Sequence, residues 1–195
     1  MPVREMEAKV ENVVASATIS ESFDLDKVNE VLEGSEYDPE KFKGVIFRIK
    51  EKDLGTSVLI FNSGKLVITG ALDKDEIERT VDYLKDLMEK KGFSVLDDPV
   101  VEIQNIVATS DFGSTLNLNN VAISLGLEKI EYEPEQFPGL VYRMDEPALV
   151  MLFFGSGKIV CTGGKNIQNI KKGLEKVSKE LIDTGFLPEK KNKRN

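Results

Sequence analysis

One apolar hairpin pattern occurs twice in this sequence, and the duplication limits the folds open to the chain more than any other feature. The first copy is LIFNSGKLVIT at residues 59–69, and the second is LFFGSGKIVCT at residues 152–162. In each copy a Ser-Gly-Lys turn joins two apolar runs, which predicts a β-hairpin because Gly adopts the left-handed backbone of a tight turn. The runs are apolar at successive positions, whereas a strand with one solvated face alternates. Both faces of the hairpin should therefore contact apolar groups.

The duplication extends beyond the hairpin. Residues 57–70 align with residues 150–163 with eight of 14 positions identical, and residues 37–50 align with residues 132–145 with six of 14 identical. Two long copies predict a pseudo-two-fold molecule and not a solenoid. The expected domains are a first repeat at 1–98, a second repeat at 99–186 and a basic flexible tail at 187–195.

Each copy predicts the same order of elements in an α+β fold: a strand, a short helix, three strands and a long helix. In the first copy these are a strand at 10–17, a helix capped by Ser22 or Asp24 and ended by Gly34, strands at 45–49, 57–61 and 66–70, and a helix at 73–91. In the second copy they are a strand at 101–108, a helix at 118–125, strands at 140–144, 149–154 and 159–162, and a helix at 166–183.

The predicted elements leave one face of the sheet without cover. The apolar residues of each long helix form a single stripe, so each long helix covers one face of the sheet only. No further element remains for the other face. An exposed apolar face of this size indicates a binding surface.

Composition narrows the chemistry. The chain has no histidine and a single cysteine, Cys161. The commonest general base and metal ligand are therefore missing, and neither an internal disulfide nor a Cys-built zinc site can form. Neither a G-x-G-x-x-G nor a G-x-x-x-x-G-K-[ST] phosphate loop is present. An enzyme that works through carboxylates or lysine remains the alternative, but we expect a protein without enzymatic activity, cofactor or bound metal.

The distribution of charged and apolar residues predicts the compartment and bears on partners. No apolar run approaches the ~20 residues of a membrane span, and the N-terminus lacks an apolar signal region, so a cytoplasmic protein is expected. The net charge of −8 argues at first against nucleic acid as a partner. Potential is local, however, and acidic helices would lie away from the uncovered face. The tail carries Lys190, Lys191, Lys193 and Arg194, whose simplest interpretation is a solvated terminus.

The motifs of the chain resemble those of the TATA-box-binding protein family, in particular its archaeal members. The resemblance is carried by QNIVAT at 104–109, YEPEQFPGLVYRM at 132–144 and SGKIVCTG at 156–163, with their counterparts in the first copy, and covers about residues 5–186. It implies a saddle in which one curved antiparallel sheet of about ten strands has helices on its convex face and DNA under its concave face. Binding and kinking of DNA through the minor groove are known properties of that family.

The resemblance also implies which residues would lie in the groove. The floor of an A·T minor groove offers only acceptors and lacks the guanine amino group, so apolar residues can lie against it. The apolar groove residues would be Val14, Leu59, Val67, Val107, Leu152 and Val160. The polar groove residues would be Asn12, Asn105, Thr69 and Thr162. From the residues alone, core packing remains the alternative for the apolar set, and a hydrogen bond to a neighbouring strand remains the alternative for the polar set.

Aromatic, cationic and acidic residues would have separate roles. The phenylalanines that would wedge between base pairs are Phe42, Phe61, Phe137 and Phe154, for which core packing is again the alternative. The residues that would contact phosphates are Arg48, Ser63, Lys65, Arg143, Ser156 and Lys158. The residues of the loop on which the family docks transcription factor B are Glu133, Glu135 and Gln136. Solvated surface is the alternative for both of these last sets.

The function implied by the resemblance is that of a general transcription initiation factor. Such a protein would bind and bend the A·T-rich TATA element, recruit transcription factor B and RNA polymerase, and be nucleoid-associated in an archaeal cell. One alternative is a DNA-glycosylase-related domain of the same fold, which would need a base-flipping pocket and further catalytic helices. The other is a protein-interaction module that covers its apolar face by self-association, as a homodimer without DNA.

Overall fold

The computed structural model describes residues 6–51 and 53–188. The chain divides into two compact units, which we describe separately. The N-terminal unit consists of residues 12–105, and the C-terminal unit consists of residues 6–11 and 106–188. The four cationic residues of the tail lie outside the described residues.

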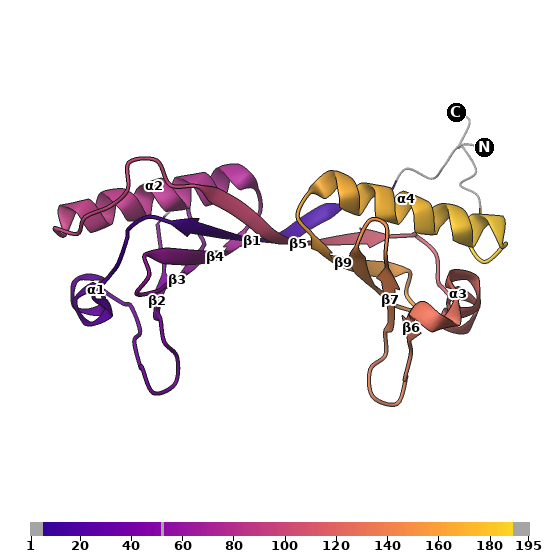
Figure 1. Ribbon diagram of the computed structural model, residues 1–195. Coiled ribbons are helices and arrows are strands. Elements are labelled where there is room, and N and C mark those ends of the chain that lie inside the picture. The colour runs from indigo at the N-terminus through magenta and orange to yellow at the C-terminus, as the bar shows by residue number, and fades with distance from the viewer. Residues whose placement is uncertain (1–5, 52, 189–195) are drawn as a thin grey trace. The chain divides into compact units, whose positions relative to one another are not determined.

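The N-terminal unit is an antiparallel sheet with a short and a long helix. Its elements are β1 (Lys9–Thr18, from residue 12 on), α1 (Leu25–Val31), β2 (Val45–Arg48), β3 (Ser57–Ile60), β4 (Lys65–Ala71) and α2 (Lys74–Lys90). The strands pair in the order β2-β3-β4-β1. Asp24 and Asp73 cap the two helices, each accepting a hydrogen bond from a backbone N–H three residues on. α2 lies along one face of the strands (Figure 1).

The C-terminal unit repeats this arrangement. Its elements are β5 (Val101–Asp111, from residue 106 on), α3 (Leu118–Leu125), a 3₁₀ turn (Leu127–Lys129), β6 (Ile130–Glu131), β7 (Leu140–Met144), β8 (Leu149–Phe153), β9 (Lys158–Gly164) and α4 (Ile167–Asp183). The strands pair antiparallel in the order β5-β9-β8-β7-β6. Asn166 caps α4, which lies along one face of this unit's strands (Figure 1).

The predicted tandem α+β repeat with an antiparallel sheet is confirmed. In the described residues, the strands are hydrogen-bonded in the order β2-β3-β4-β1 within the N-terminal unit and β5-β9-β8-β7-β6 within the C-terminal unit, which makes nine strands where the family resemblance implied about ten. The sequence patterns missed β6 because two residues are too short for a period-2 signal. At the matching place in the first copy there is only an isolated bridge between Glu36 and Ile46, which accounts for the difference in number.

The hairpin turns need their glycines for two reasons. Gly64 and Gly157 have φ angles of 75° and 95°, in the region that side chains with a Cβ rarely adopt. A Cβ on Gly64 would lie 1.8 Å from the Ser20 carbonyl oxygen, and one on Gly157 would lie 2.2 Å from that of Ser114. The Ser-Gly-Lys motif therefore marks turns that pack directly against another segment of backbone.

One contact between the long helix and the sheet is made by different residues in the two units. In the N-terminal unit, Thr56 and Thr80 are buried and their hydroxyl oxygens lie 3.1 Å apart. Their repeat counterparts are Leu149 and Gly173, and a Cβ on Gly173 would lie 2.5 Å from Leu149 Cδ1. Leu149 is larger than Thr56 and Gly173 is smaller than Thr80, so the two changes offset each other in volume. The long helix can therefore pack closely on the sheet in both units.

Candidate nucleic-acid interface

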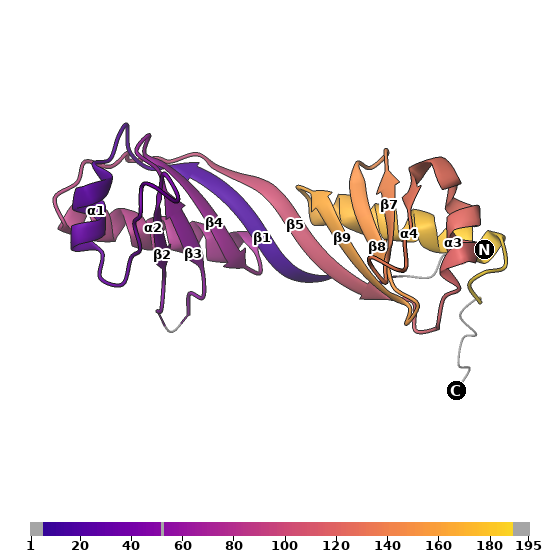
Figure 2. The ribbon, with the colours of Figure 1, turned by 90° about the horizontal axis from the view of Figure 1, so that it is seen from below.

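In the N-terminal unit, the strands are apolar on both faces. The face away from α2, which we call the open face, carries Ile46, Leu59 and Val67, which are aligned across β2, β3 and β4. These three are half-buried, whereas the alternate residues Ile60 and Leu66 are fully buried. The view from below in Figure 2 shows no helix in front of these strands. The apolar open face therefore lacks cover from the described part of this unit.

The C-terminal unit has an equivalent open face, on the side of its sheet away from α4. Val141, Leu152 and Val160 are aligned across β7, β8 and β9, and all three are half-buried. Met151 and Phe153, which alternate with them, are 0% exposed. No helix lies in front of these strands in Figure 2 either. The two hairpins recognised in the sequence thus form the centre of the two open faces.

The predicted apolar groove residues all belong to the open face of their own unit. Leu59, Val67, Leu152 and Val160 lie in the aligned rows described above. Val14 and Val107 are also half-buried, and they lie where the register of β1 with β4 and of β5 with β9 shifts. The residues on either side of each of these two valines are buried, which places Val14 and Val107 on the opposite face.

Asn12 has hydrogen-bond partners within the protein. Its Nδ2 donates to Thr69 Oγ1 at 3.2 Å, and its Oδ1 accepts from the Gly70 N–H at 2.8 Å. Asn12 thus makes the hydrogen bonds to a neighbouring strand that the alternative describes, and its role toward DNA stays a prediction. A carboxamide has two donor hydrogens, so one remains for another acceptor. Asn105 and Thr162 are half-buried, and their role toward DNA stays a prediction.

The four predicted wedge residues form one pair in each unit. The ring centroids of Phe42 and Phe61 are 5.8 Å apart, with an interplanar angle of 69°. Those of Phe137 and Phe154 are 6.0 Å apart, at 72°. This edge-to-face arrangement is favourable for aromatic rings. Phe42 is 36% exposed and Phe137 is 40% exposed, so each pair presents one ring to solvent.

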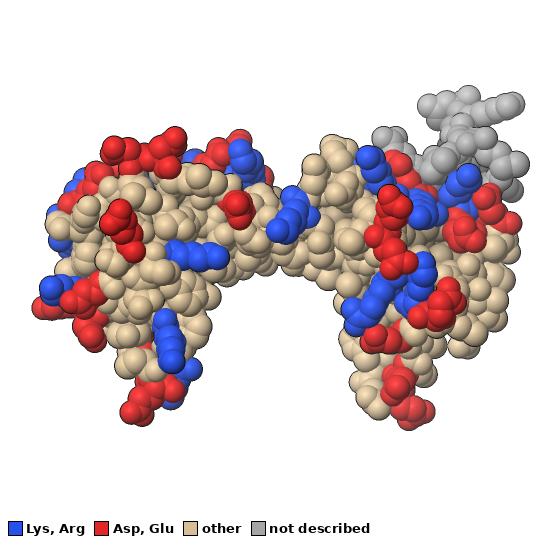
Figure 3. Space-filling view, viewed as in Figure 1, with Lys and Arg blue, Asp and Glu red and all other residues tan. Residues whose placement is uncertain are grey.

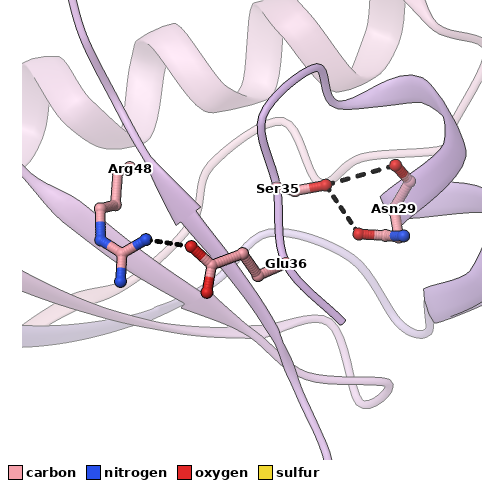
Figure 4. A network of polar contacts seen from close by, with 4 residues as sticks. All are labelled: Asn29, Ser35, Glu36 and Arg48. Atoms are coloured by element: carbon pink, nitrogen blue, oxygen red, sulfur yellow. Dashed lines mark hydrogen bonds and ion pairs between the residues drawn. The ribbon is translucent and has the colours of Figure 1, made fainter. Parts of the chain in front are cut away.

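Arg48 and Arg143, predicted to contact phosphates, are engaged in ion pairs. Arg48 Nη1 contacts Glu36 Oε1, next to the Ser35–Asn29 hydrogen bonds shown in Figure 4. Arg143 Nε lies 2.9 Å from Glu131 Oε1. Sequence reasoning missed both acids, although each precedes its arginine by the same 12 residues. Exposed ion pairs of this kind are weak, so a phosphate can replace the carboxylate.

The other predicted phosphate contacts, the serines and lysines of the two hairpin turns, are exposed; they are Ser63, Lys65, Ser156 and Lys158. Lys158 lines a groove of about 510 Å³ together with Phe154, Val160 and Glu11. Glu11, which sequence reasoning also missed, accepts from Thr109 Oγ1 at 2.8 Å and pairs with Lys9 at 3.0 Å. The hydrogen bond from Thr109, followed by that from Lys9, lowers the pKa of Glu11, so its carboxylate is charged at neutral pH.

The loop predicted to dock a protein partner is exposed. Glu133, Glu135 and Gln136 all lie in contact with solvent. The N–H groups of Gln136 and Phe137 both donate to the Glu133 carbonyl oxygen, at 2.9 and 3.0 Å. These hydrogen bonds form a backbone turn that contains both the acidic residues and Phe137, whose ring is exposed.

Residues 6–51 and 53–188 give little support for a metal site, a reactive thiol or a membrane-spanning helix. No group of three or more His, Cys, Asp or Glu residues there could hold a metal ion. Burial raises the pKa of Cys161 to about 12, so its thiol is not ionised at neutral pH. Within the same part of the chain, no helix is both long and apolar enough to cross a membrane.

Charge is unevenly distributed over the N-terminal unit. Acidic side chains gather over α2 (Figure 3), which contains six of them: Asp75, Glu76, Glu78, Asp82, Asp86 and Glu89. This helix lies on the face of the unit opposite the open face. The acidic net charge of the chain is therefore compatible with an anionic partner on the open face.

These features together define a class of protein. An apolar open face, exposed aromatic pairs and cationic residues at the strand ends are typical of proteins that bind the minor groove of DNA. The chain belongs to the family described as transcription factor TFIID, or TATA-binding protein (TBP), whose sequence model matches residues 7–91 and 100–184.

Similar proteins from archaea match almost the whole chain. The TATA-box-binding protein of Picrophilus torridus is 51% identical over 178 residues, which cover 91% of this chain and 96% of that protein. The TATA-box-binding protein of Archaeoglobus fulgidus is 48% identical over 185 residues, which cover 95% of this chain and 100% of that protein. The solved structure of Methanococcus jannaschii TBP matches with a TM-score of 0.83 at 43% identity, covering 91% of this chain and 99% of that one.

Proposed function

We propose that this protein is a general transcription initiation factor that binds the minor groove of the TATA element and bends the DNA. The observation that carries the proposal is the row of half-buried apolar residues aligned across three strands of each open face. Family membership supports it, because the archaeal relatives are named TATA-box-binding proteins. This is a binding function without catalysis.

The open face would select A·T pairs by exclusion. The minor-groove floor of A·T pairs carries only acceptors, whereas a G·C pair adds the guanine N2 amino donor. If that amino group were buried against Leu59 or Leu152, it would lose its hydrogen-bond partner, at a cost of roughly 1–3 kcal/mol. The second amide hydrogen of Asn12 would donate to a groove acceptor at an A·T pair.

The rim of the open face would hold the DNA backbone. The side chains of Lys65 and Lys158 are exposed at the ends of β4 and β9. Arg48 and Arg143 would exchange their carboxylate partners for phosphates, since both are anions that bind a guanidinium in the same way. The exposed phenylalanine pairs would enter steps between base pairs and kink the duplex.

The protein would act in the cytoplasm, associated with the nucleoid, and would assemble with other proteins. We propose transcription factor B as the partner of the loop containing Glu133, Glu135 and Gln136, and RNA polymerase as a member of the resulting complex. The comparisons do not support a glycosylase-related domain or a self-associating module as the primary function. A homodimer that covers the open faces in the absence of DNA is compatible with the same site, and a size measurement with and without duplex would detect it.

Selectivity for A·T pairs tests the proposed function. Replacing one central A·T pair of a TATA duplex by G·C should weaken binding roughly tenfold to a hundredfold, because the guanine amino group is left unpaired. A duplex with inosine in place of guanine lacks that amino group and should restore affinity. Equal affinity for the A·T and G·C duplexes, measured by fluorescence anisotropy, would contradict minor-groove selection.

The salt dependence of binding should be shallow for a DNA-binding protein. Each neutralised phosphate contributes about −0.9 to the slope of log K against log salt. The cations placed for phosphate in the two repeats are Arg48, Lys65, Arg143 and Lys158, and these four predict a slope of roughly −3 to −4. Glu11 is charged and lines the same protein groove as Lys158, so it should repel phosphate. Salt screens this repulsion, which should flatten the slope further. Burial of the apolar face should also give a large negative heat-capacity change. A slope steeper than about −7 with a heat-capacity change near zero would mean that phosphate contacts dominate.

A further inference from the structure

We infer that Gly44 and Gly139 are positioning residues for the exposed phenylalanine pairs, each providing the space in which a wedge ring lies. The inference rests on the proposed function, because the rings matter only if they enter DNA. It gives a role to two residues of the repeated motifs at 37–50 and 132–145 that are not among the predicted groove contacts.

The geometry in the C-terminal unit is the most restrictive. A Cβ built on Gly139 would lie 2.6 Å from Phe137 Cε1, 3.1 Å from Phe137 Cζ and 3.0 Å from Phe154 Cε1. These three ring atoms are the nearest atoms to that position. Both rings of the pair therefore rest against the surface that the missing side chain leaves open.

The N-terminal unit repeats the contact with its own pair. A Cβ on Gly44 would lie 2.8 Å from Phe42 Cε1 and 3.3 Å from Phe42 Cζ. The carbonyl oxygen of Ile60, on the neighbouring strand β3, would be 3.2 Å away. Gly44 and Gly139 are both buried and occupy equivalent positions of the repeat, so the same device occurs in both units.

The backbone does not explain these two glycines. Neither belongs to the glycines with positive φ, in contrast to Gly64 and Gly157 in the hairpin turns. Alanine could adopt the same backbone conformation at both positions, so the requirement is for space. Carbon atoms in contact normally lie about 3.5–4.0 Å apart, so a methyl group would displace the ring by roughly 1 Å.

The displaced ring could move without unfolding the protein. Phe42 and Phe137 are partly exposed, so their rings can turn outward into solvent. The cost to stability should then be small, but each ring would leave the edge-to-face arrangement in which it meets its partner. An effect on DNA bending without a matching effect on stability distinguishes a positioning role from a purely structural one.

Gly139→Ala tests the inference when combined with Phe137→Ala in a double-mutant cycle. Gly139→Ala alone should weaken binding to the TATA duplex roughly tenfold and reduce its bend, measured by fluorescence transfer between the duplex ends, with an almost unchanged Tm. In the Phe137→Ala background, most of this loss should disappear, because the ring that the methyl group displaces is gone. Gly55→Ala is the matched control, since a Cβ there meets nothing within 4 Å.

Gly44→Ala is the independent variant, and it should reproduce the effect in the N-terminal unit if Gly139→Ala does not fold. Parental binding and bending by both variants would overturn the inference, and so would equal losses in the presence and absence of the Phe137 ring. If Phe137→Ala itself binds and bends DNA like the parent, the wedge role in the proposed function fails. If Phe137→Ala is impaired and Gly139→Ala is not, only the positioning role fails.

Discussion

Phe154→Ala should bend the TATA duplex less than the parent protein does, while the folded state loses only about 1 kcal/mol. The Phe154 side chain is half-buried on the open face and meets Phe137 edge to face, so its removal costs mainly one aromatic contact. In the complex, the same side chain is proposed to unstack a base step, an action that alanine cannot perform. End-to-end fluorescence transfer on a labelled duplex reports the bend, and urea unfolding reports the stability.

The neighbouring Phe153 provides the matched control for this prediction. Its side chain is fully buried and lies 6.4 Å from the ring of Phe112 in a stacked arrangement. Phe153→Ala should therefore destabilise the fold by about 3–5 kcal/mol, as truncation of a core phenylalanine does. If Phe154→Ala costs as much as Phe153→Ala, then Phe154 is a core residue and its assignment as a wedge is wrong.

Reversing the charge of the acidic loop should abolish the ternary complex with transcription factor B and leave the binary DNA complex intact. The double variant Glu133→Lys/Glu135→Lys changes two exposed carboxylates without touching the backbone hydrogen bonds that shape the turn. Carboxylates repel phosphate, so these side chains are suited to a protein partner and not to DNA. Gel-shift assays with and without transcription factor B separate the two complexes.

An equal change of net charge elsewhere is the control for that experiment. Asp82→Lys/Asp86→Lys alters two acidic residues of α2, on the opposite side of the N-terminal unit from its open face. This variant should form both complexes. Loss of the binary and ternary complexes to the same extent in the Glu133→Lys/Glu135→Lys variant would show that the loop serves DNA binding instead.

The sequence was most informative where a pattern is repeated. Successive strand residues point to opposite faces, and Phe153 is accordingly buried whereas Phe154 is half-buried. Of the two candidate caps of the first helix, Ser22 and Asp24, the structure has Asp24, and the turn glycines mark the hairpins as predicted; such features depend on residues close in the chain. The strand β6 was missed because its two residues are too few to show the alternation by which strands are recognised.

Sequence alone determined the tandem repeat, the order of elements and the apolar open face, because hydrophobic periodicity and turn chemistry are local properties that the duplication displays twice. Only the tertiary structure decided which side chains meet across strands and loops. The bonds of Asn12 to Thr69 and Gly70, the ion pairs of the two arginines and the space at Gly44 depend on strand register and loop closure. Asn12 and Thr69 are 57 residues apart and each arginine is 12 residues from its acid, and no local pattern encodes which of these side chains meet.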